Sequence, residues 1–153
     1  VRGVGYDVRE LQAHIKKILA VNRDWNLAVA GIGKLGSAFL EHQNLAARRF
    51  KCMAAFDNDP EKIGKTMPSG IRICDIADLA EIVEELDIEI GVITTPPLAA
   101  QSVADLFLDT QVNAILNFSP ARIRVPECCL VENIDFTVRL DILTYKLVHE
   151  IDA

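Results

Sequence analysis

The residues best suited to chemistry form the segment Gly31-Ile32-Gly33-Lys34-Leu35-Gly36. This G-x-G-x-x-G pattern directly follows the apolar run N-L-A-V-A and directly precedes a segment of helical character. In a dinucleotide-binding turn the first glycine permits the tight turn, the second lets backbone N–H groups approach a pyrophosphate, and the third lets the helix pack on the strand. The helix N-terminus adds N–H donors and a partial positive charge. The motif predicts a dinucleotide site; a tight βα turn without ligand is the alternative.

An acidic residue stands where such a site needs one. Asp57 ends the second predicted strand, 21 residues after Gly36. A carboxylate at this point accepts hydrogen bonds from the hydroxyls of the adenosine ribose and repels the 2′-phosphate of NADP, which favours NAD(H) as the cofactor. The nearby cation is Lys62, which lies in the following turn, after Pro60.

Two further segments are expected at the same rim. Thr94, Thr95 and Pro96 follow the fourth predicted strand, and Asn117 ends the fifth. Ligands of open α/β sheets bind outside the carboxyl ends of the strands, so these residues should face the cofactor. Taken singly, each threonine and proline is equally compatible with the ordinary start of a helix.

The alternation of elements predicts an α/β fold of Rossmann type, doubly wound around a mostly parallel sheet. An amphipathic helix over 7–20 precedes the first strand. The predicted strands are 26–33, 52–56, 71–74, 90–94, 112–117 and 129–131, and the predicted helices between and after them are 35–48, 76–86, 98–110 and 134–151. We assign residues 1–133 to a dinucleotide-binding domain and 134–153 to a dimerisation helix.

The closing helix over 134–151 has two apolar stripes. With 100° of rotation per residue, the first stripe consists of Ile134, Val138, Ile142, Tyr145 and Val148. The second stripe lies on nearly the opposite side and consists of Phe136, Leu140, Leu143, Leu147 and Ile151. An outer helix of a Rossmann sheet needs one apolar stripe, so two opposed stripes predict cover by a partner subunit or another domain.

Composition and charge narrow the function classes. The 153 residues are half hydrophobic, with apolar runs too short for a membrane span. Residues 52–153 hold 7 Lys and Arg against 18 Asp and Glu, a balance of -11, so this part is a poor nucleic-acid binder by itself. Cys52, Cys74, Cys128 and Cys129 lack metal-binding spacing and are expected to be reduced core thiols in a cytoplasmic protein.

Catalytic constellations are missing near these rims. The sequence offers no Ser–His–Asp set, no cysteine beside a histidine and no cluster of metal ligands there. His14, His42 and His149 all fall in predicted helices, as surface residues. A dehydrogenase also needs a substrate domain and a general acid/base, for which 153 residues leave no space. The sequence therefore predicts a protein that binds a nicotinamide dinucleotide without transforming it, not an enzyme.

Six motifs along nearly the whole chain resemble the Rex family, the redox-sensing transcriptional repressors that respond to the NADH/NAD ratio. They are G-V-G-Y-D-V, V-A-G-I-G-K-L-G, F-D-N-D-P-E-K-I-G, T-T-P-P-L-A-A-Q, I-L-N-F-S-P and V-P-E-C-C-L-V-E-N-I-D-F. The family's T-V-P appears here as T-T-P, and the adjacent Cys128 and Cys129 are outside the family pattern. Buried strand thiols are the favoured interpretation of that pair, and a second, thiol-based sensor is the alternative.

The resemblance implies roles for individual residues. Gly31, Gly33 and Gly36 would hold the pyrophosphate and Asp57 the ribose, while Thr94, Thr95 and Pro96 would line the nicotinamide side. Tyr6 resembles the family tyrosine after the domain linker. Asp135 resembles the acidic residue near the nicotinamide, and Phe136 the aromatic residue packed between the two nicotinamides of a dimer.

The resemblance also implies partners and a mechanism. It implies a homodimer that swaps its C-terminal helices, and operator DNA bound through a winged-helix domain that this sequence lacks. NADH would favour a closed dimer that releases DNA, through its differential affinity for two states. Two alternatives stay open: a fragment of a nicotinamide-dependent reductase, and a CoA-binding Rossmann module.

Overall fold

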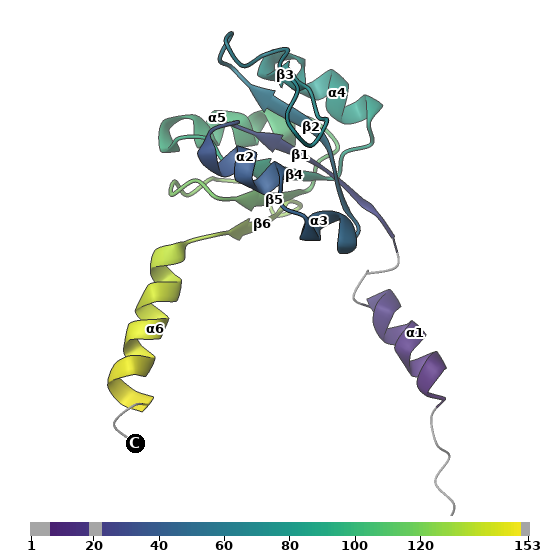
Figure 1. Ribbon diagram of the computed structural model, residues 1–153, viewed down its shortest axis with the longest axis vertical. Helices are drawn as coiled ribbons and strands as arrows, with labels where there is room; N and C mark the ends of the chain where they lie inside the picture. The colour runs from purple at the N-terminus through teal and green to yellow at the C-terminus, as the bar shows by residue number, and fades with distance from the viewer. Residues whose placement is uncertain (1–6, 19–22, 151–153) are drawn as a thin grey trace, which may run out of the picture.

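The computed structural model describes residues 7–18 and 23–150, and its centre is one parallel sheet (Figure 1). The strands are β1 (Trp25–Ala30), β2 (Phe50–Asp57), β3 (Ile73–Asp75), β4 (Ile90–Ile93), β5 (Ala114–Asn117) and β6 (Leu130–Asn133). Their order is β3-β2-β1-β4-β5-β6, with every pair parallel. The chain therefore reverses its winding between β1 and β4, which places a switch point there. The predicted Rossmann-like α/β fold is confirmed.

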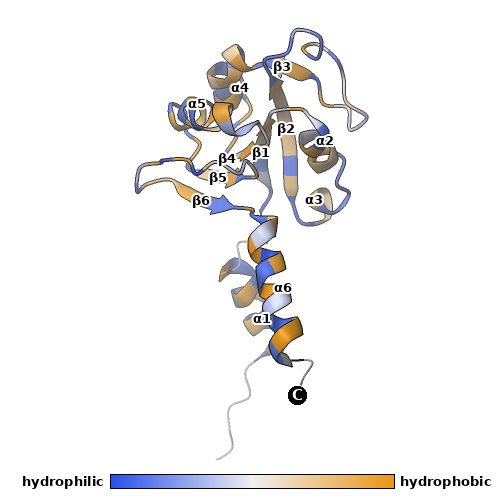
Figure 2. Cartoon of the chain, turned by 90° about the vertical axis from the view of Figure 1, so that its left-hand side faces the viewer, coloured by the Kyte–Doolittle hydropathy of each residue, from blue (hydrophilic) through white to orange (hydrophobic). Residues whose placement is uncertain are grey.

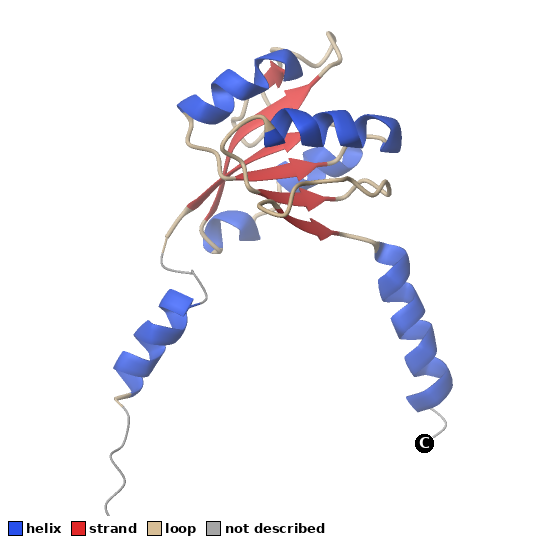
Figure 3. Cartoon of the chain, turned by 180° about the vertical axis from the view of Figure 1, so that it is seen from behind, coloured by secondary structure: helices blue, strands red, loops and turns tan. Residues whose placement is uncertain are grey.

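Helices cover both faces of this sheet. On one face lie α2 (Lys34–Leu40) and α3 (Asn44–Ala47); on the other lie the 3-10 turn η1 (Ile76–Asp78), α4 (Leu79–Glu85) and α5 (Pro97–Leu108), which stand in front of the sheet in Figure 3. Successive residues of β1 alternate between two apolar cores: Leu27 and Val29 face α2, while Ala28 and Ala30 face α4 and α5. A strand covered on both faces is apolar throughout, which explains the run N-L-A-V-A.

The single helix predicted over 35–48 is wrong, because the segment forms two short helices. α2 ends at Leu40 and α3 begins at Asn44, and His42 lies in the turn between them. There the backbone N–H of Asn44 donates to Nδ1 of His42 at 3.3 Å. A side chain that accepts a nearby backbone N–H competes with the helical ladder, which accounts for the break.

Two helices stand away from the sheet (Figures 1 and 2): α1 (Val8–Ile18) and α6 (Phe136–Glu150). α6 begins two residues later than predicted, because Asp135 caps it: its Oδ1 accepts from the backbone N–H and the hydroxyl of Thr137, at 2.9 and 2.6 Å. These hydrogen bonds hold the pKa of the Asp135 carboxyl below its usual value. Ile151 lies outside the described residues.

Both predicted stripes of α6 are exposed in the single chain. The exposed fractions run from 44% at Ile142 to 65% at Tyr145, and residues of the opposite stripe such as Leu140 and Leu143 are 58% and 53% exposed. Figure 2 shows apolar residues all along this helix, and Figure 1 shows it apart from the sheet and from α1. An uncovered helix of this kind carries a strong hydrophobic drive toward association.

The cysteines are only partly core residues. Cys129 is buried just before β6, Cys52 and Cys74 are half-buried, and Cys128 is exposed in a turn. The interpretation of Cys128 and Cys129 as two buried strand thiols is therefore wrong for Cys128, since the turn that precedes the edge strand β6 points it outward. Burial raises the pKa of the Cys52 thiol to about 12 and also raises that of Cys129. Among the described residues, no helix combines the length and apolar composition that a membrane-spanning helix needs.

Candidate dinucleotide site

A cleft of about 660 Å³ lies at the switch point, outside the carboxyl ends of β1, β2 and β4. Five segments line it: the glycine turn after β1, the loop after β2, the turn η1 after β3, the loop and first turns of α5, and the loop after β5. The lining residues used below are Gly31, Ile32, Gly33, Leu35, Asp57, Asp59, Lys62, Ile76, Thr94, Thr95, Pro96, Phe118 and Pro120. Parallel strands bring these loops together because their carboxyl ends share one edge of the sheet.

The three glycines of the turn have different surroundings. Gly31 has a φ of +97°, which disfavours any side chain, and an added Cβ would lie 2.8 Å from the Thr95 methyl group. A Cβ on Gly36 would clash with the carbonyl oxygen of Gly31, so this glycine lets α2 approach β1. A Cβ on Gly33 would meet nothing within 4 Å. Gly33 therefore keeps open a space at the start of α2, where a pyrophosphate would meet backbone N–H groups.

Asp57 is held tightly at the end of β2. Its residue is 6% exposed, and its Oδ2 accepts from the backbone N–H of Ile32 at 2.8 Å and from Nζ of Lys62 at 3.2 Å. Its Oδ1 accepts from the backbone N–H of Asp59 at 2.9 Å. Burial by itself raises the pKa of the Asp57 carboxyl, but these three hydrogen bonds outweigh burial and hold the pKa below its usual value. The carboxylate is thus ionised and fixed beside the glycine turn.

The opposite end of the cleft is uncharged. The Thr94 hydroxyl donates to the carbonyl oxygen of Gly31 at 2.6 Å, so Thr94 supports the glycine turn. Thr95 presents a buried hydroxyl oxygen that has no hydrogen-bond partner among the described residues. A buried polar atom without a partner is costly unless a ligand or water satisfies it. Together with the space at Gly33, Thr95 shows that the cleft fits a polar ligand that spans both ends.

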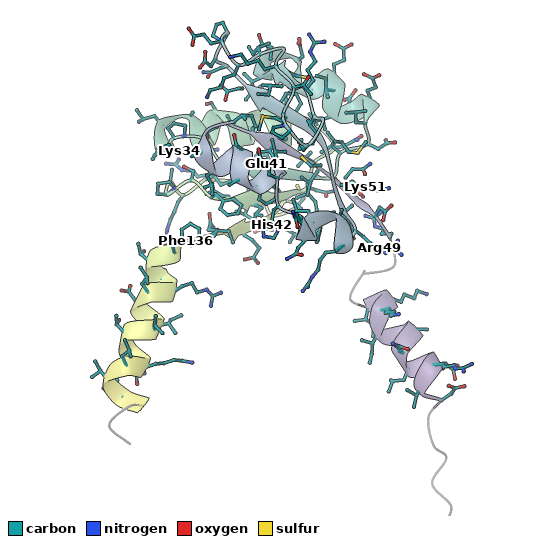
Figure 4. The ribbon with its side chains drawn as sticks, viewed as in Figure 1. Lys34, Glu41, His42, Arg49, Lys51 and Phe136 are labelled. Atoms are coloured by element: carbon teal, nitrogen blue, oxygen red, sulfur yellow. The ribbon has the colours of Figure 1, made fainter. Side chains whose placement is uncertain are left out.

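Other predicted site residues lie beside this cleft. Lys34 is exposed at the start of α2, and Figure 4 shows it on the side of the body from which α6 leaves. Asn117 is fully buried behind the rim, where its side chain hydrogen-bonds to Ser119, Ala121 and Asn133. Asp135 and Phe136 stand at the root of α6, and Phe136 is 61% exposed. Tyr6 lies outside the described residues.

Two further residues gain importance: Phe118, which the sequence places at the same rim as Asn117, and Asn133, which sequence reasoning did not assign to the site. Phe118 lines the cleft and packs edge-on against Phe39 of α2, with ring centroids 5.7 Å apart. Asn133, at the end of β6, accepts a hydrogen bond from Asn117 at 2.9 Å. Phe118 directly follows the rim residue Asn117, so its position pointed to the cleft, whereas nothing in the local sequence links Asn133 to Asn117.

Comparison with known protein sequences gives two findings. The family described as CoA binding domain matches residues 22–121. The redox-sensing transcriptional repressor Rex of Syntrophobacter fumaroxidans is 49% identical over 147 residues, which cover 96% of the chain and 70% of that relative's length.

Solved structures of the repressor RSP are also similar to this chain. RSP in complex with beta-NADH matches with a TM-score of 0.84 at 28% identity, covering 95% of this chain and 70% of RSP. RSP in complex with beta-NAD+ and operator DNA matches with a TM-score of 0.86 at 28% identity, covering 98% and 69%. RSP itself is described as a Rex-family repressor.

Proposed function

Because the chain belongs to the Rex family of redox-sensing transcriptional repressors, and its Rossmann part to the CoA binding domain family, we propose that it senses NADH against NAD for a repressor of transcription. The observation that carries the proposal is the fixed, ionised Asp57 beside the open space at Gly33. Asp57 accepts from the adenosine ribose while the N–H of Ile32 anchors its carboxylate, and the N–H groups of Gly33, Lys34 and Leu35 surround the pyrophosphate. As part of this proposal, a regulator of transcription of this family acts in the cytoplasm.

Thr95, Pro96 and Phe118 would contact the nicotinamide end of the ligand, and the Thr95 hydroxyl would hydrogen-bond to the carboxamide or the ribose. NADH and NAD differ there in charge and planarity, so discrimination belongs at this end. Among the described residues that line the cleft, the ionisable ones, Asp57, Asp59 and Lys62, belong to the other end. We favour sensing over turnover by a reductase because the relatives of this chain are redox-sensing transcriptional repressors.

We also propose a homodimer formed through α6. Both stripes of this helix are exposed, and burial of each large apolar side chain is worth about 1.5–3 kcal/mol. Phe136 and Asp135 stand at the start of this helix, so a swapped α6 would bring them to the partner's nicotinamide end. A role for Tyr6 there is implied by the family resemblance alone. Operator DNA is the proposed partner because RSP is described in complex with operator DNA, and the contact would be made by the winged-helix domain that the family resemblance implies.

CoA is the second candidate, since the family matched over 22–121 carries that name. CoA bears a phosphate on its ribose, next to the hydroxyls that Asp57 would bind. A buried, ionised carboxylate repels such a group, so the local charge favours NAD(H).

A titration of NADH fluorescence, competed with NAD, NADP and CoA, tests the proposal. We expect saturable NADH binding that NAD displaces, and that NADP and CoA displace only at higher concentration. Displacement by CoA ahead of NAD would favour the CoA-binding function, and no NADH binding would contradict the proposal.

A further inference from the structure

The carboxamide of Asn117 lies at a crossing of three segments. Asn117 is 0% exposed at the end of β5. Its Oδ1 accepts from the backbone N–H of Ser119 at 3.0 Å, and its Nδ2 donates to the carbonyl oxygen of Ala121 at 2.9 Å. These two hydrogen bonds shape the loop that carries Phe118 and Pro120 into the cleft.

The same Nδ2 reaches across to β6. It donates to Oδ1 of Asn133 at 2.9 Å, and the backbone N–H of Ile134 donates to the carbonyl oxygen of Asn117 at 2.9 Å. Asn117 and Asn133 are the last residue pair of the two strands. The orientation of both amides is fixed by chemistry, because Ala121 O can only accept and Ser119 N can only donate, so Asn133 must present its oxygen.

The hydrogen bond between Asn117 and Asn133 lies close in sequence to the start of α6. Asp135 caps the helix by accepting from Thr137, and Phe136 is its first residue. Figure 4 shows Phe136 where α6 meets the sheet. On the cleft side of Asn117, the backbone N–H of Phe118 donates to the carbonyl oxygen of Ile93, which directly precedes Thr94 and Thr95 at the rim. Through Asn117, the uncharged end of the cleft and the root of α6 therefore share one hydrogen-bond network.

We infer that Asn133 is a positioning residue that couples occupancy of the cleft to the placement of α6. The inference rests on the proposed function for the identity of the ligand. A ligand that orders Phe118 and Pro120 also orders Asn117, and the Asn117–Asn133 hydrogen bond carries that order to Ile134 and the first turn of α6. Asn133 is not among the residues that line the cleft, and it is exposed, so its side chain can be altered without opening the core.

Amide hydrogen exchange of the full chain, with and without saturating NADH, tests this coupling. In the unaltered chain we expect NADH to slow exchange both in the rim loop 118–121 and along the first half of α6. In Asn133→Ala the rim loop should keep its protection, while NADH protection of α6 falls by about fivefold, the equivalent of one lost hydrogen bond. NADH affinity should change by less than about threefold, since no cleft contact is removed.

Two variants serve as matched controls. Asn133→Asp keeps an oxygen that accepts from Asn117 and should retain NADH protection of α6. Glu132→Ala alters the neighbouring exposed residue of β6 and should behave like the unaltered chain. Thermal melting of each variant separates a folding defect from a coupling defect.

The outcomes separate the inference from the proposed function. Equal NADH protection of α6 in Asn133→Ala and the unaltered chain would overturn the inference, and so would an Asn133→Asp variant that behaves like Asn133→Ala. NADH protection of the rim without any effect on α6 in the unaltered chain would overturn it too, while leaving NADH binding intact. Failure of the unaltered chain to bind NADH would overturn the proposed function and the inference with it.

Discussion

The backbone N–H of Ile32 donates to Oδ2 of Asp57 at 2.8 Å, although 25 residues separate the two along the chain. The bond joins the middle of the glycine turn to the end of β2. Because Asp57 is also held by Asp59 and Lys62, the ribose and pyrophosphate ends of the proposed site form one preorganised unit. A site fixed before the ligand arrives loses little conformational entropy on binding.

Asp57→Ala should weaken NADH binding by roughly 1–3 kcal/mol, through loss of charge-assisted hydrogen bonds to the ribose. NADPH binding should weaken less, because the carboxylate also repels its 2′-phosphate. Fluorescence titrations with both dinucleotides measure the difference, and Asp57→Asn, which keeps the shape, separates the effect of charge. Equal losses for NADH and NADPH would rule out the ribose assignment.

Lys62→Met should sharpen the discrimination against NADPH. The Lys62 ammonium group lies 3.2 Å from Asp57 Oδ2, with its side chain 38% exposed, and partly neutralises the carboxylate. Its removal should raise the ratio of the NADPH to the NADH dissociation constant by about fivefold, the scale of a partly exposed charge pair. Lys65→Met, at an exposed position three residues on, is the control. An unchanged ratio would show that Lys62 does not reach the 2′-phosphate.

Gly33→Ala and Gly36→Ala should fail in different ways. A Cβ at Gly33 meets open space, so the variant should melt near the temperature of the unaltered chain, yet bind NADH about tenfold or more weakly because the pyrophosphate loses backbone contact. A Cβ at Gly36 meets the carbonyl oxygen of Gly31, so that variant should lose about 1–3 kcal/mol of stability. Calorimetry and NADH titration of both variants check this. Full NADH affinity in folded Gly33→Ala would place the ligand elsewhere.

Ile142→Asp and Leu143→Asp, one on each stripe of α6, should both dissociate the proposed dimer. Each removes a large apolar side chain whose burial is worth about 1.5–3 kcal/mol and places a charge in its stead. Arg139→Ala, at an exposed polar position of the same helix, is the control. Sedimentation at micromolar concentration should show a dimer for the unaltered chain and the control. A monomeric unaltered chain would contradict the account, and so would a dimer formed by either the Ile142→Asp or the Leu143→Asp variant.

The parts of the candidate site that are built from short sequence motifs can be predicted from the sequence. The glycine turn and Asp57 are local signals tied to strand ends, so the parallel Rossmann-type sheet and the meeting of these two segments in one cleft could be predicted. The break in the 35–48 segment could not, because it depends on His42 bonding to the backbone of Asn44 in place of the helical ladder. Apolar periodicity alone continues smoothly through that turn.

The uncharged end was harder to predict for a related reason. Thr94, Thr95 and Asn117 were assigned together as rim residues, but their bonding differs. Thr94 supports Gly31, the Thr95 hydroxyl has no hydrogen-bond partner within residues 7–18 and 23–150, and Asn117 turns inward to Asn133. The direction of a polar side chain at a strand end depends on partners distant in sequence, which position along the strand does not reveal.

A crystal structure of the chain grown with NADH tests the central claim most directly. The account predicts the adenosine ribose hydroxyls within hydrogen-bond distance of the Asp57 carboxylate, the pyrophosphate over Gly33, and the nicotinamide beside Thr95 and Phe118. A dinucleotide bound in the reverse direction, with its adenosine beside Thr95, or bound outside this cleft, would contradict it.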